Sequence, residues 1–230
     1  RLSIFTILGP GTFYTYDSEG DKTDSAVYRN TTVVKNFFGF EPRFSMTYVL
    51  NKTNSIKASY TRIYQYLHLL SNSTSGNPTD LWLPTSKNIK PQWADQWVVG
   101  YFKNLANNNY EVSVEVYYKT MNNLIDYKSG ADIILNPDVE SQLLFGKGRA
   151  YGTELFIKKK EGNLTGWISY TLSRTFRQFD GIDQGKRFPA KQDRIHDISI
   201  VAMYKVSQKW TFASTWVFDT RNTVCFPSGL

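Results

Sequence analysis

A chain of 230 residues, 41% of them hydrophobic, can form a folded core, so its composition excludes intrinsic disorder. Mean hydropathy is -0.40, and no run approaches the roughly 20 apolar residues of a transmembrane helix, which excludes a helical membrane protein but not a membrane barrel. The net charge of +7 comes from dispersed Lys and Arg, so we expect no nucleic-acid partner, and two His and one Cys predict no disulfide, His/Cys metal site or cofactor.

Strand-like segments recur from end to end of the chain. Each is rich in β-branched and aromatic residues and alternates with a period of two, whereas no segment of comparable length has helical periodicity. We predict about nine strands and an all-β, antiparallel fold. The strands are expected over residues 1–8, 40–50, 55–68, 95–104, 110–121, 150–160, 164–176, 194–206 and 210–219.

Short and long connections alternate between these segments. Tight turns rich in Asn and Gly, which tolerate positive φ, fall near 51–54, 107–109, 161–163 and 207–209. Long connections cover 9–39, 69–94, 122–149 and 177–193. This alternation is typical of an up-and-down transmembrane β-barrel in the outer membrane, where short turns face the periplasm. We therefore expect Asn108 and Gly162 on the periplasmic side and the loop near Asn77 outside.

The predicted strands have one apolar and one polar face. The candidate lipid-facing and aromatic-girdle side chains are Tyr110, Val112, Val114, Val116, Tyr118, Trp210, Phe212, Trp216 and Phe218. Glu111, Ser113, Glu115 and Glu154 are candidate lumen-facing residues, because a charge on the lipid face costs about 2–4 kcal/mol at mid-depth. A β-sandwich core with aromatic caps is the alternative interpretation.

Several stretches resemble the barrel of TonB-dependent receptors of the Bacteroidetes type. They are Glu41–Tyr48, Ser55–Arg62 with Gln65 and Tyr66, Ile89–Gln92 with Gly100–Phe102, Gly148–Leu155, Gly166–Ser173 and Asp193–Asp197. Their order and spacing cover nearly the whole chain, although each piece alone is weakly specific. The resemblance ends at Asp219–Asn222, where relatives usually carry Thr-Gly. The plug domain and TonB box of the family have no counterpart in these residues.

The resemblance implies an outer-membrane active transporter that binds a scarce nutrient at the cell surface and imports it with energy relayed by TonB. It implies the TonB complex and outer-membrane lipid as partners, and it leaves a surface lipoprotein partner open. The substrate would be a small molecule, a glycan or a peptide. Candidate ligand contacts are Tyr14, Tyr16, Trp82 and Trp93, because aromatic side chains on outer loops suit stacking on a ligand. The alternatives are a passive porin-like channel, a surface adhesin, or a secreted soluble carbohydrate-binding β-sandwich.

No catalytic constellation is expected. His196 and Asp197 are adjacent in a predicted strand, so they point to opposite faces and cannot form a relay. Glu111 and Glu115 lie roughly 13 Å apart at Cα, too far for a typical carboxylate pair. The sequence contains no phosphate-binding loop, zinc motif or nucleophile elbow.

An outer-membrane barrel of about nine strands would be incomplete. Bacterial barrels normally have an even number of strands, and a plugged lumen needs about 22. We therefore expect residues 1–230 to be part of one larger barrel domain, with a plug and earlier strands before Arg1 and at least one strand after Leu230. The first and last strands should be unpaired edges of an open, curved sheet.

Overall fold

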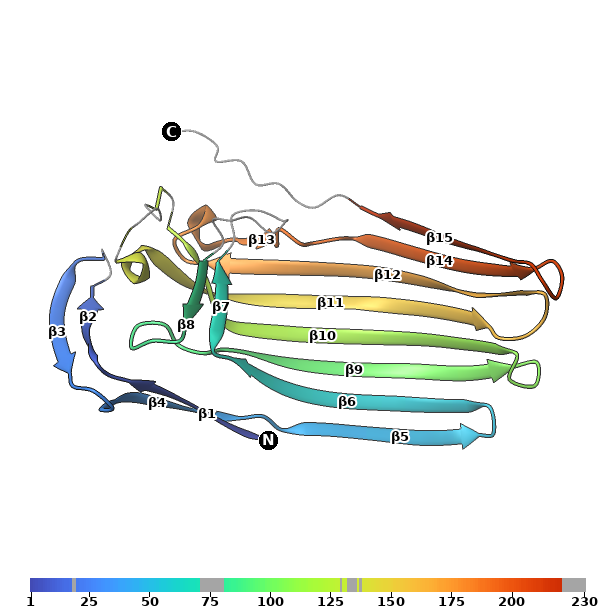
Figure 1. The fold of residues 1–230 in the computed structure, drawn as a ribbon, viewed down its shortest axis with the longest axis horizontal. Coiled ribbons are helices and arrows are strands. Elements are labelled where there is room, and N and C mark those ends of the chain that lie inside the picture. Colours follow the sequence, from blue (N-terminus) through green and yellow to red (C-terminus); the bar gives the residue numbers. More distant parts are fainter. Residues whose placement is uncertain (18–19, 71–80, 129, 132–135, 137, 221–230) are drawn as a thin grey trace.

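The computed structural model describes residues 1–17, 20–70, 81–128, 130–131, 136 and 138–220 (Figure 1). The loop near Asn77, the segment from 221 onward and the expected strand after Leu230 lie outside these ranges. Within them, the largest element is an antiparallel sheet of nine strands, in the order β15-β14-β12-β11-β10-β9-β6-β5 with β13 beside β12. Its strands are β5 (Arg43–Asn51), β6 (Asn54–Gln65), β9 (Gln92–Leu105), β10 (Tyr110–Tyr127), β11 (Leu143–Lys159), β12 (Leu164–Phe179), β13 (Arg187–Pro189), β14 (His196–Lys205) and β15 (Thr211–Asp219).

The described helical structure consists of two short 3-10 segments, η1 (Val139–Gln142) and η2 (Asp183–Gly185). None of the helices in the described ranges has the length and apolar character needed to cross a membrane. The all-β, antiparallel fold class is therefore confirmed. The sheet is open, because its edge strands β5 and β15 do not pair with each other.

The tight connections of the large sheet gather at one end and the long ones at the other (Figure 1). The turn between β9 and β10 contains Ala106, Asn107 and Asn108 with φ of 50°, 54° and 70°, and Gly162 in the β11–β12 turn has φ of 100°. These left-handed conformations explain the Asn and Gly residues at the turns. The predicted alternation of short and long connections is confirmed.

Three two-stranded sheets lie at the end with the long connections (Figure 1). They pair β1 (Leu2–Leu8) with β4 (Val33–Phe40), β2 (Gly11–Tyr16) with β3 (Lys22–Tyr28), and β7 (Leu67–Leu70) with β8 (Leu81–Pro84). The prediction that 1–8 forms an edge of the main sheet is wrong, since Leu2 pairs with Phe40 of β4 and β5 is the edge instead. A hairpin outside the sheet has the same period-two alternation as a sheet strand, so sequence alone did not separate the two.

A small buried core sits where these outer elements meet the large sheet. Leu70 of β7, Ile89, Ile125 of β10 and Leu143 of β11 form one cluster. The hydroxyl of Ser86 accepts a hydrogen bond of 3.0 Å from the backbone N–H of Ile89 and so fixes the segment leading into β9. Most other large apolar side chains of the sheet are exposed, so this single layer is suited to contact a further apolar phase.

Candidate functional site

The register divides the large sheet into an apolar face and a polar face. Residues directly opposite one another in antiparallel strands share a face. The row through Val114 is Tyr48, Ile56, Tyr101, Val114, Leu155, Tyr170, Ile198 and Phe218. Every member of this row is aromatic or aliphatic, so apolar side chains continue across eight strands.

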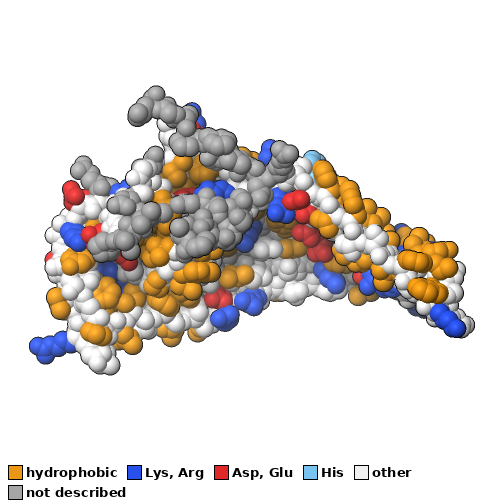
Figure 2. Space-filling view, turned by 45° about the horizontal axis from the view of Figure 1, so that its top comes forward, with side chains coloured by type: hydrophobic (Ala, Val, Ile, Leu, Met, Phe, Trp, Pro, Cys, Tyr) orange, Lys and Arg blue, Asp and Glu red, His pale blue; other side chains and the backbone are white. Residues whose placement is uncertain are grey.

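The neighbouring row belongs to the polar face. It consists of Thr47, Lys57, Gly100, Glu115, Glu154, Thr171, Asp197 and Asp219. Glu115 and Glu154 are direct cross-strand partners, and an added Cβ at Gly100 would lie 2.9 Å from Cγ of Glu115. Gly100 therefore leaves the space that Glu115 occupies. Figure 2 shows acidic side chains gathered where the molecular surface is hollowed, while hydrophobic side chains cover broad areas elsewhere.

Aromatic side chains concentrate at the outer end of the apolar face, where the long connections begin. Phe44, Tyr60, Trp97, Tyr118 and Tyr151 occupy one row across five strands. The rings of Tyr60 and Trp97 are 5.5 Å apart at their centroids, and those of Trp97 and Tyr118 are 6.1 Å apart. We call these five residues the outer aromatic row.

The spacing of the aromatic residues matches the thickness of a membrane. Tyr110 stands at the turn end of β10, where Nζ of Lys159 lies 5.8 Å from its ring centroid. Tyr110 and Tyr118 are eight residues apart on β10, which corresponds to roughly 27 Å along the strand. The tilt of a barrel strand reduces this to about 20 Å along the membrane normal, near the about 25 Å of the apolar band.

The lipid-facing candidates outside β10 lie in or beside β15, and for those within β15 the register gives their neighbours on β14. Phe212 and Trp216 lie in β15, opposite Tyr204 and Ile200 of β14. Trp210 immediately precedes β15 and is exposed. The structure therefore places the described candidates of the last hairpin on one continuous surface with those of β14.

The polar candidates of β10 differ in their surroundings. Glu111 forms an ion pair of 3.1 Å with Lys160 at the turn end. Ser113 is only 7% exposed and lies between Phe102 and Phe156 in the register. Ser113 therefore has little room for a larger side chain.

Two of the four candidate ligand-contacting aromatics belong to a polar cluster on the β2–β3 hairpin. The hydroxyl of Tyr16 donates a hydrogen bond of 3.0 Å to Oδ1 of Asp138, and Nζ of Lys22 lies 2.8 Å from Oδ2 of the same carboxylate. Lys22 also stands 4.2 Å from the centroid of the Tyr14 ring. Burial and the Asp138 carboxylate raise the pKa of Tyr16 to about 12, and Lys22 lowers the pKa of Asp138. We call Tyr14, Tyr16, Lys22 and Asp138 the outer polar cluster.

Asn88 connects this hairpin to the segments that enter β9 and β11. Its side-chain amide donates hydrogen bonds to the backbone oxygen of Tyr14 at 3.0 Å and to Oε2 of Glu140 at 2.6 Å. The hairpin is thus held at the outer end of the large sheet by Asn88, which is 74 positions from Tyr14 and 52 positions from Glu140.

The other two candidate aromatics lie on different elements. Trp82 is in β8, opposite Leu69, and is 57% exposed. Trp93 was expected in a long loop, and this is wrong, since β9 begins at Gln92 and the Arg62 guanidinium stacks 4.6 Å from the centroid of the Trp93 ring. No ring contact joins either tryptophan to Tyr14 or Tyr16, and all four lie in the described ranges.

Long-range ion pairs stabilise the outer part of the sheet, and sequence reasoning missed them. Arg62 binds Asp95 through two hydrogen bonds of 2.7 and 2.8 Å, and the Tyr60 hydroxyl donates a third, of 2.8 Å. Arg174 pairs with the buried Asp193 at 3.0 Å. These partners are 33 and 19 residues apart, so only the strand register brings them together.

The histidines have structural partners. Nδ1 of His196 lies 2.8 Å from the Tyr170 hydroxyl, whereas Asp197 is on the polar face opposite Thr171. The prediction that His196 and Asp197 point to opposite faces is confirmed. His68 is buried, with Nε2 3.1 Å from Oγ1 of Thr85, and burial lowers its pKa.

The large sheet has one apolar and one polar face, an aromatic row at its outer end and elaborated connections at that same end, which are the features of a transmembrane β-barrel wall. The chain belongs to the family of TonB-dependent receptor-like β-barrels, whose family model matches residues 8–223. No curated protein sequence matches the chain.

Three solved structures share the fold. The ferripyoverdine receptor of the outer membrane of Pseudomonas aeruginosa, bound to ferripyoverdine, is 15% identical with a TM-score of 0.55, over 86% of this chain and 27% of the receptor. The ferric-catecholate import receptor Fiu of K12 E. coli is 16% identical with a TM-score of 0.53, over 84% and 26%. The alcaligin outer-membrane receptor FauA of Bordetella pertussis is 19% identical with a TM-score of 0.53, over 86% and 32%. The chain thus spans about a quarter to a third of the length of these receptors.

Proposed function

We propose that the chain forms part of the barrel of an active transporter, which binds a scarce nutrient at the cell surface and imports it with energy relayed by TonB. The observation that carries this proposal is the match of the family model to residues 8–223. The continuous apolar face and the gathering of long connections at one end support it. We extend the proposal to receptors of the Bacteroidetes type because of the order of the sequence motifs. No catalytic step is part of the proposal.

We propose that the apolar face contacts outer-membrane lipid and that the polar face lines the lumen. The row through Val114 would then lie in hydrocarbon, and Glu115 and Glu154 would face the interior. Residues 1–230 would be part of one barrel domain, in which further strands pair with β5 and β15. This closure follows from the energetic cost of the two edges, since each unsatisfied backbone group in lipid costs several kcal/mol.

We propose the outer polar cluster as a ligand-contacting surface. Tyr14 and Tyr16 offer aromatic edges beside the charged groups of Lys22 and Asp138, a combination that suits a polar ligand with ring systems. Ferric chelates are the first substrates to test, because the solved receptors include a ferripyoverdine and a ferric-catecholate receptor. A vitamin, a glycan or a peptide remains the alternative substrate class, and a surface lipoprotein would be an additional partner.

Uptake measurements on the full-length receptor test the function. The receptor would be expressed in an outer membrane without other ferric-chelate receptors, in strains with and without tonB, and offered iron-55 complexes of pyoverdine, a catecholate and alcaligin. We expect saturable accumulation of at least one complex that disappears without tonB. A passive channel would give unsaturable entry in both strains, and an adhesin would give none. Recovery of the receptor in a soluble fraction without detergent would contradict the membrane location.

A further inference from the structure

Three cationic residues occupy neighbouring positions at the outer end of the apolar face. Lys147 and Arg149 lie in β11 and Arg187 in β13. Lys147 pairs with Gln178 of β12, which in turn pairs with Arg187, so Lys147 and Arg187 share one row. The register between β11 and β12 has no shift from Gly146 to Lys159, so Lys147 and Arg149 are on the same face as Leu155, the partner of Val114.

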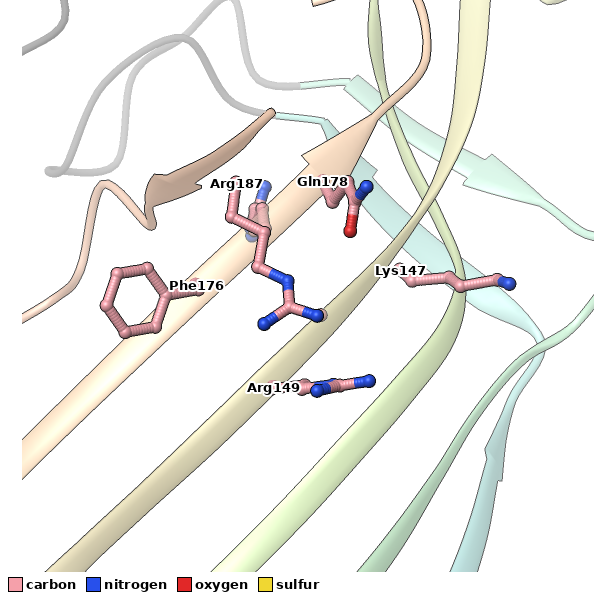
Figure 3. A pocket seen from close by; sticks show the side chains of 7 residues that line it. Lys147, Arg149, Phe176, Gln178 and Arg187 are labelled. Carbon is pink, nitrogen blue, oxygen red and sulfur yellow. The ribbon is translucent and has the colours of Figure 1, made fainter. Parts of the chain in front are cut away.

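These residues line one open pocket, shown in Figure 3. The pocket residues are Lys147, Gly148, Arg149, Phe176, Arg177, Gln178 and Arg187. In Figure 3 the Arg187 side chain extends from β13 across β12 toward β11, and its guanidinium ends between Phe176 and Arg149. Four of these residues are cationic, and Arg177 is paired with Asp126, which leaves three cations, an aromatic ring and an amide to offer charge and hydrogen-bond donors to a single ligand.

The three cations are exposed, and no carboxylate among the described residues neutralises them. Two other arginines nearby pair with carboxylates, Arg174 with Asp193 at 3.0 Å and Arg177 with Asp126 at 3.6 Å. By contrast, Lys147, Arg149 and Arg187 form no ion pair with any residue in the described ranges. Three like charges at one place repel one another, and an anion would relieve this repulsion.

Asp180 does not supply that anion. It lines an adjoining pocket together with Lys147, yet none of the ion pairs among the described residues includes Asp180 or Lys147. The positive charge of the pocket therefore remains open to a ligand from outside the described chain.

The height of the pocket on the sheet indicates what kind of ligand reaches it. Arg149 and Lys147 lie beyond the outer aromatic row, on the side of the long connections, because they come two and four residues before Tyr151 on β11. These separations correspond to roughly 7 and 13 Å along the strand toward the end with the long connections. Aromatic rows mark the boundary between the acyl chains and the headgroups of a bilayer, so the pocket lies at headgroup level on the exterior of the barrel.

We propose that Lys147, Arg149 and Arg187 form a binding site for the phosphate group of a phosphorylated lipid in the outer leaflet. This inference rests on the proposed orientation, with the apolar face in lipid. Two guanidinium groups can each bind a phosphate through paired N–H groups, and the ammonium of Lys147 adds a third charge. Phe176 and Tyr151, whose rings stack at 6.4 Å, offer an apolar surface to the part of the lipid below its phosphate.

Lipid binding to the purified full-length receptor tests this site. The receptor would be reconstituted in nanodiscs of a zwitterionic phospholipid, and the affinity for bisphosphorylated lipid A would be compared with that for its dephosphorylated form. The site variant is Lys147→Gln/Arg149→Gln/Arg187→Gln. We expect it to lose at least tenfold in affinity for the phosphorylated lipid and to keep the wild-type affinity for the dephosphorylated one.

The matched control is Lys52→Gln/Lys205→Gln/Lys209→Gln, which removes the same three charges at the turn end of the sheet, where all three side chains are exposed. We expect wild-type affinity for this control. An equal loss of lipid affinity in both triple variants would show that the affinity depends only on net charge, and it would overturn the proposed site. If the triple site variant does not fold, Arg187→Gln is compared with Arg187→Lys, and an equal affinity of Arg187→Gln and wild type overturns the proposal.

Two further readouts separate the possible outcomes. Inorganic phosphate at millimolar concentration should not displace the lipid, and displacement would identify a site for a free anion instead. Folding, measured by heat-dependent mobility on gels, and TonB-dependent uptake are followed in the same variants. Unchanged lipid affinity in a folded, active variant overturns the lipid site alone, whereas failure of the wild type to insert into the nanodisc overturns the proposed function.

Discussion

Placing a charge on the apolar face is the most direct test of the orientation of the sheet. Val114 lies four residues from Tyr110 and four from Tyr118, so it would stand near the middle of the membrane. Its row is apolar from Tyr48 to Phe218, and no acidic side chain of that row could pair with a new cation. We expect Val114→Arg to destabilise the inserted receptor by about 2–4 kcal/mol, which corresponds to roughly 30- to 1000-fold in the folding equilibrium.

The matched control introduces the same residue on the polar face. Ser113 is a poor choice because it is 7% exposed and is crowded in the register by Phe102 and Phe156. Glu154 is exposed and lies directly opposite Glu115, so Glu154→Arg would place opposite charges side by side. We expect this variant to insert nearly as well as the wild type.

The measurement is urea-dependent folding of the full-length receptor into lipid vesicles, read from its heat-dependent mobility on gels. The two variants are compared with the wild type at the same lipid composition, and the difference in folding free energy is taken from the shift of the midpoint. Equal destabilisation by Val114→Arg and Glu154→Arg would refute the assignment of the faces. A larger loss for Glu154→Arg would reverse it.

Three further predictions follow from the outer end of the sheet. Burial lowers the pKa of His68, so below its ordinary value of 6.5 protons bind preferentially to the unfolded state and destabilise the folded one. The protection of β7–β8 against hydrogen exchange, corrected for intrinsic rates, should therefore fall from pH 7.5 to pH 5.5 in the wild type. It should stay constant in His68→Gln. Asp95→Ala removes both acceptors of Arg62 and should lower the free energy of unfolding by about 1–3 kcal/mol in urea titrations, and a change within error would show that the pair adds nothing. In a cysteine-free background, Glu140→Cys should react with an impermeant maleimide on intact cells and Asn108→Cys should not, and the opposite result would invert the topology.

The sequence determined the two faces and the turn end of this protein. Period-two alternation is a local property, and a strand that has one apolar and one polar face fixes which side chains lie together whatever its partner is. The placement of Val112, Val114 and Val116 on one face of β10 and of Glu111 and Glu115 on the other follows from this rule. The Asn and Gly turns could also be predicted from the sequence, because the positive φ at Asn107, Asn108 and Gly162 restricts the residue types that fit.

The sequence could not determine which strands pair. The segment 1–8 has the alternation of a sheet strand but pairs with β4 outside the main sheet, and Trp93 reads as a loop residue although it lies in β9. Strands pair through hydrogen bonds between segments far apart in the chain, and the local pattern of one segment does not determine which partner it has.

The candidate sites also depend on which strands pair and in which register. Tyr16 meets Asp138 from 122 residues away, and Arg62 meets Asp95 from 33 residues away. The cationic pocket combines Lys147 and Arg149 of β11 with Arg187 of β13, which adjoin only because both strands pair with β12. Charges that lie dispersed in the sequence thus become one site through the register of three strands. The tertiary structure alone decided this, since register is a property of paired backbones and not of any single segment.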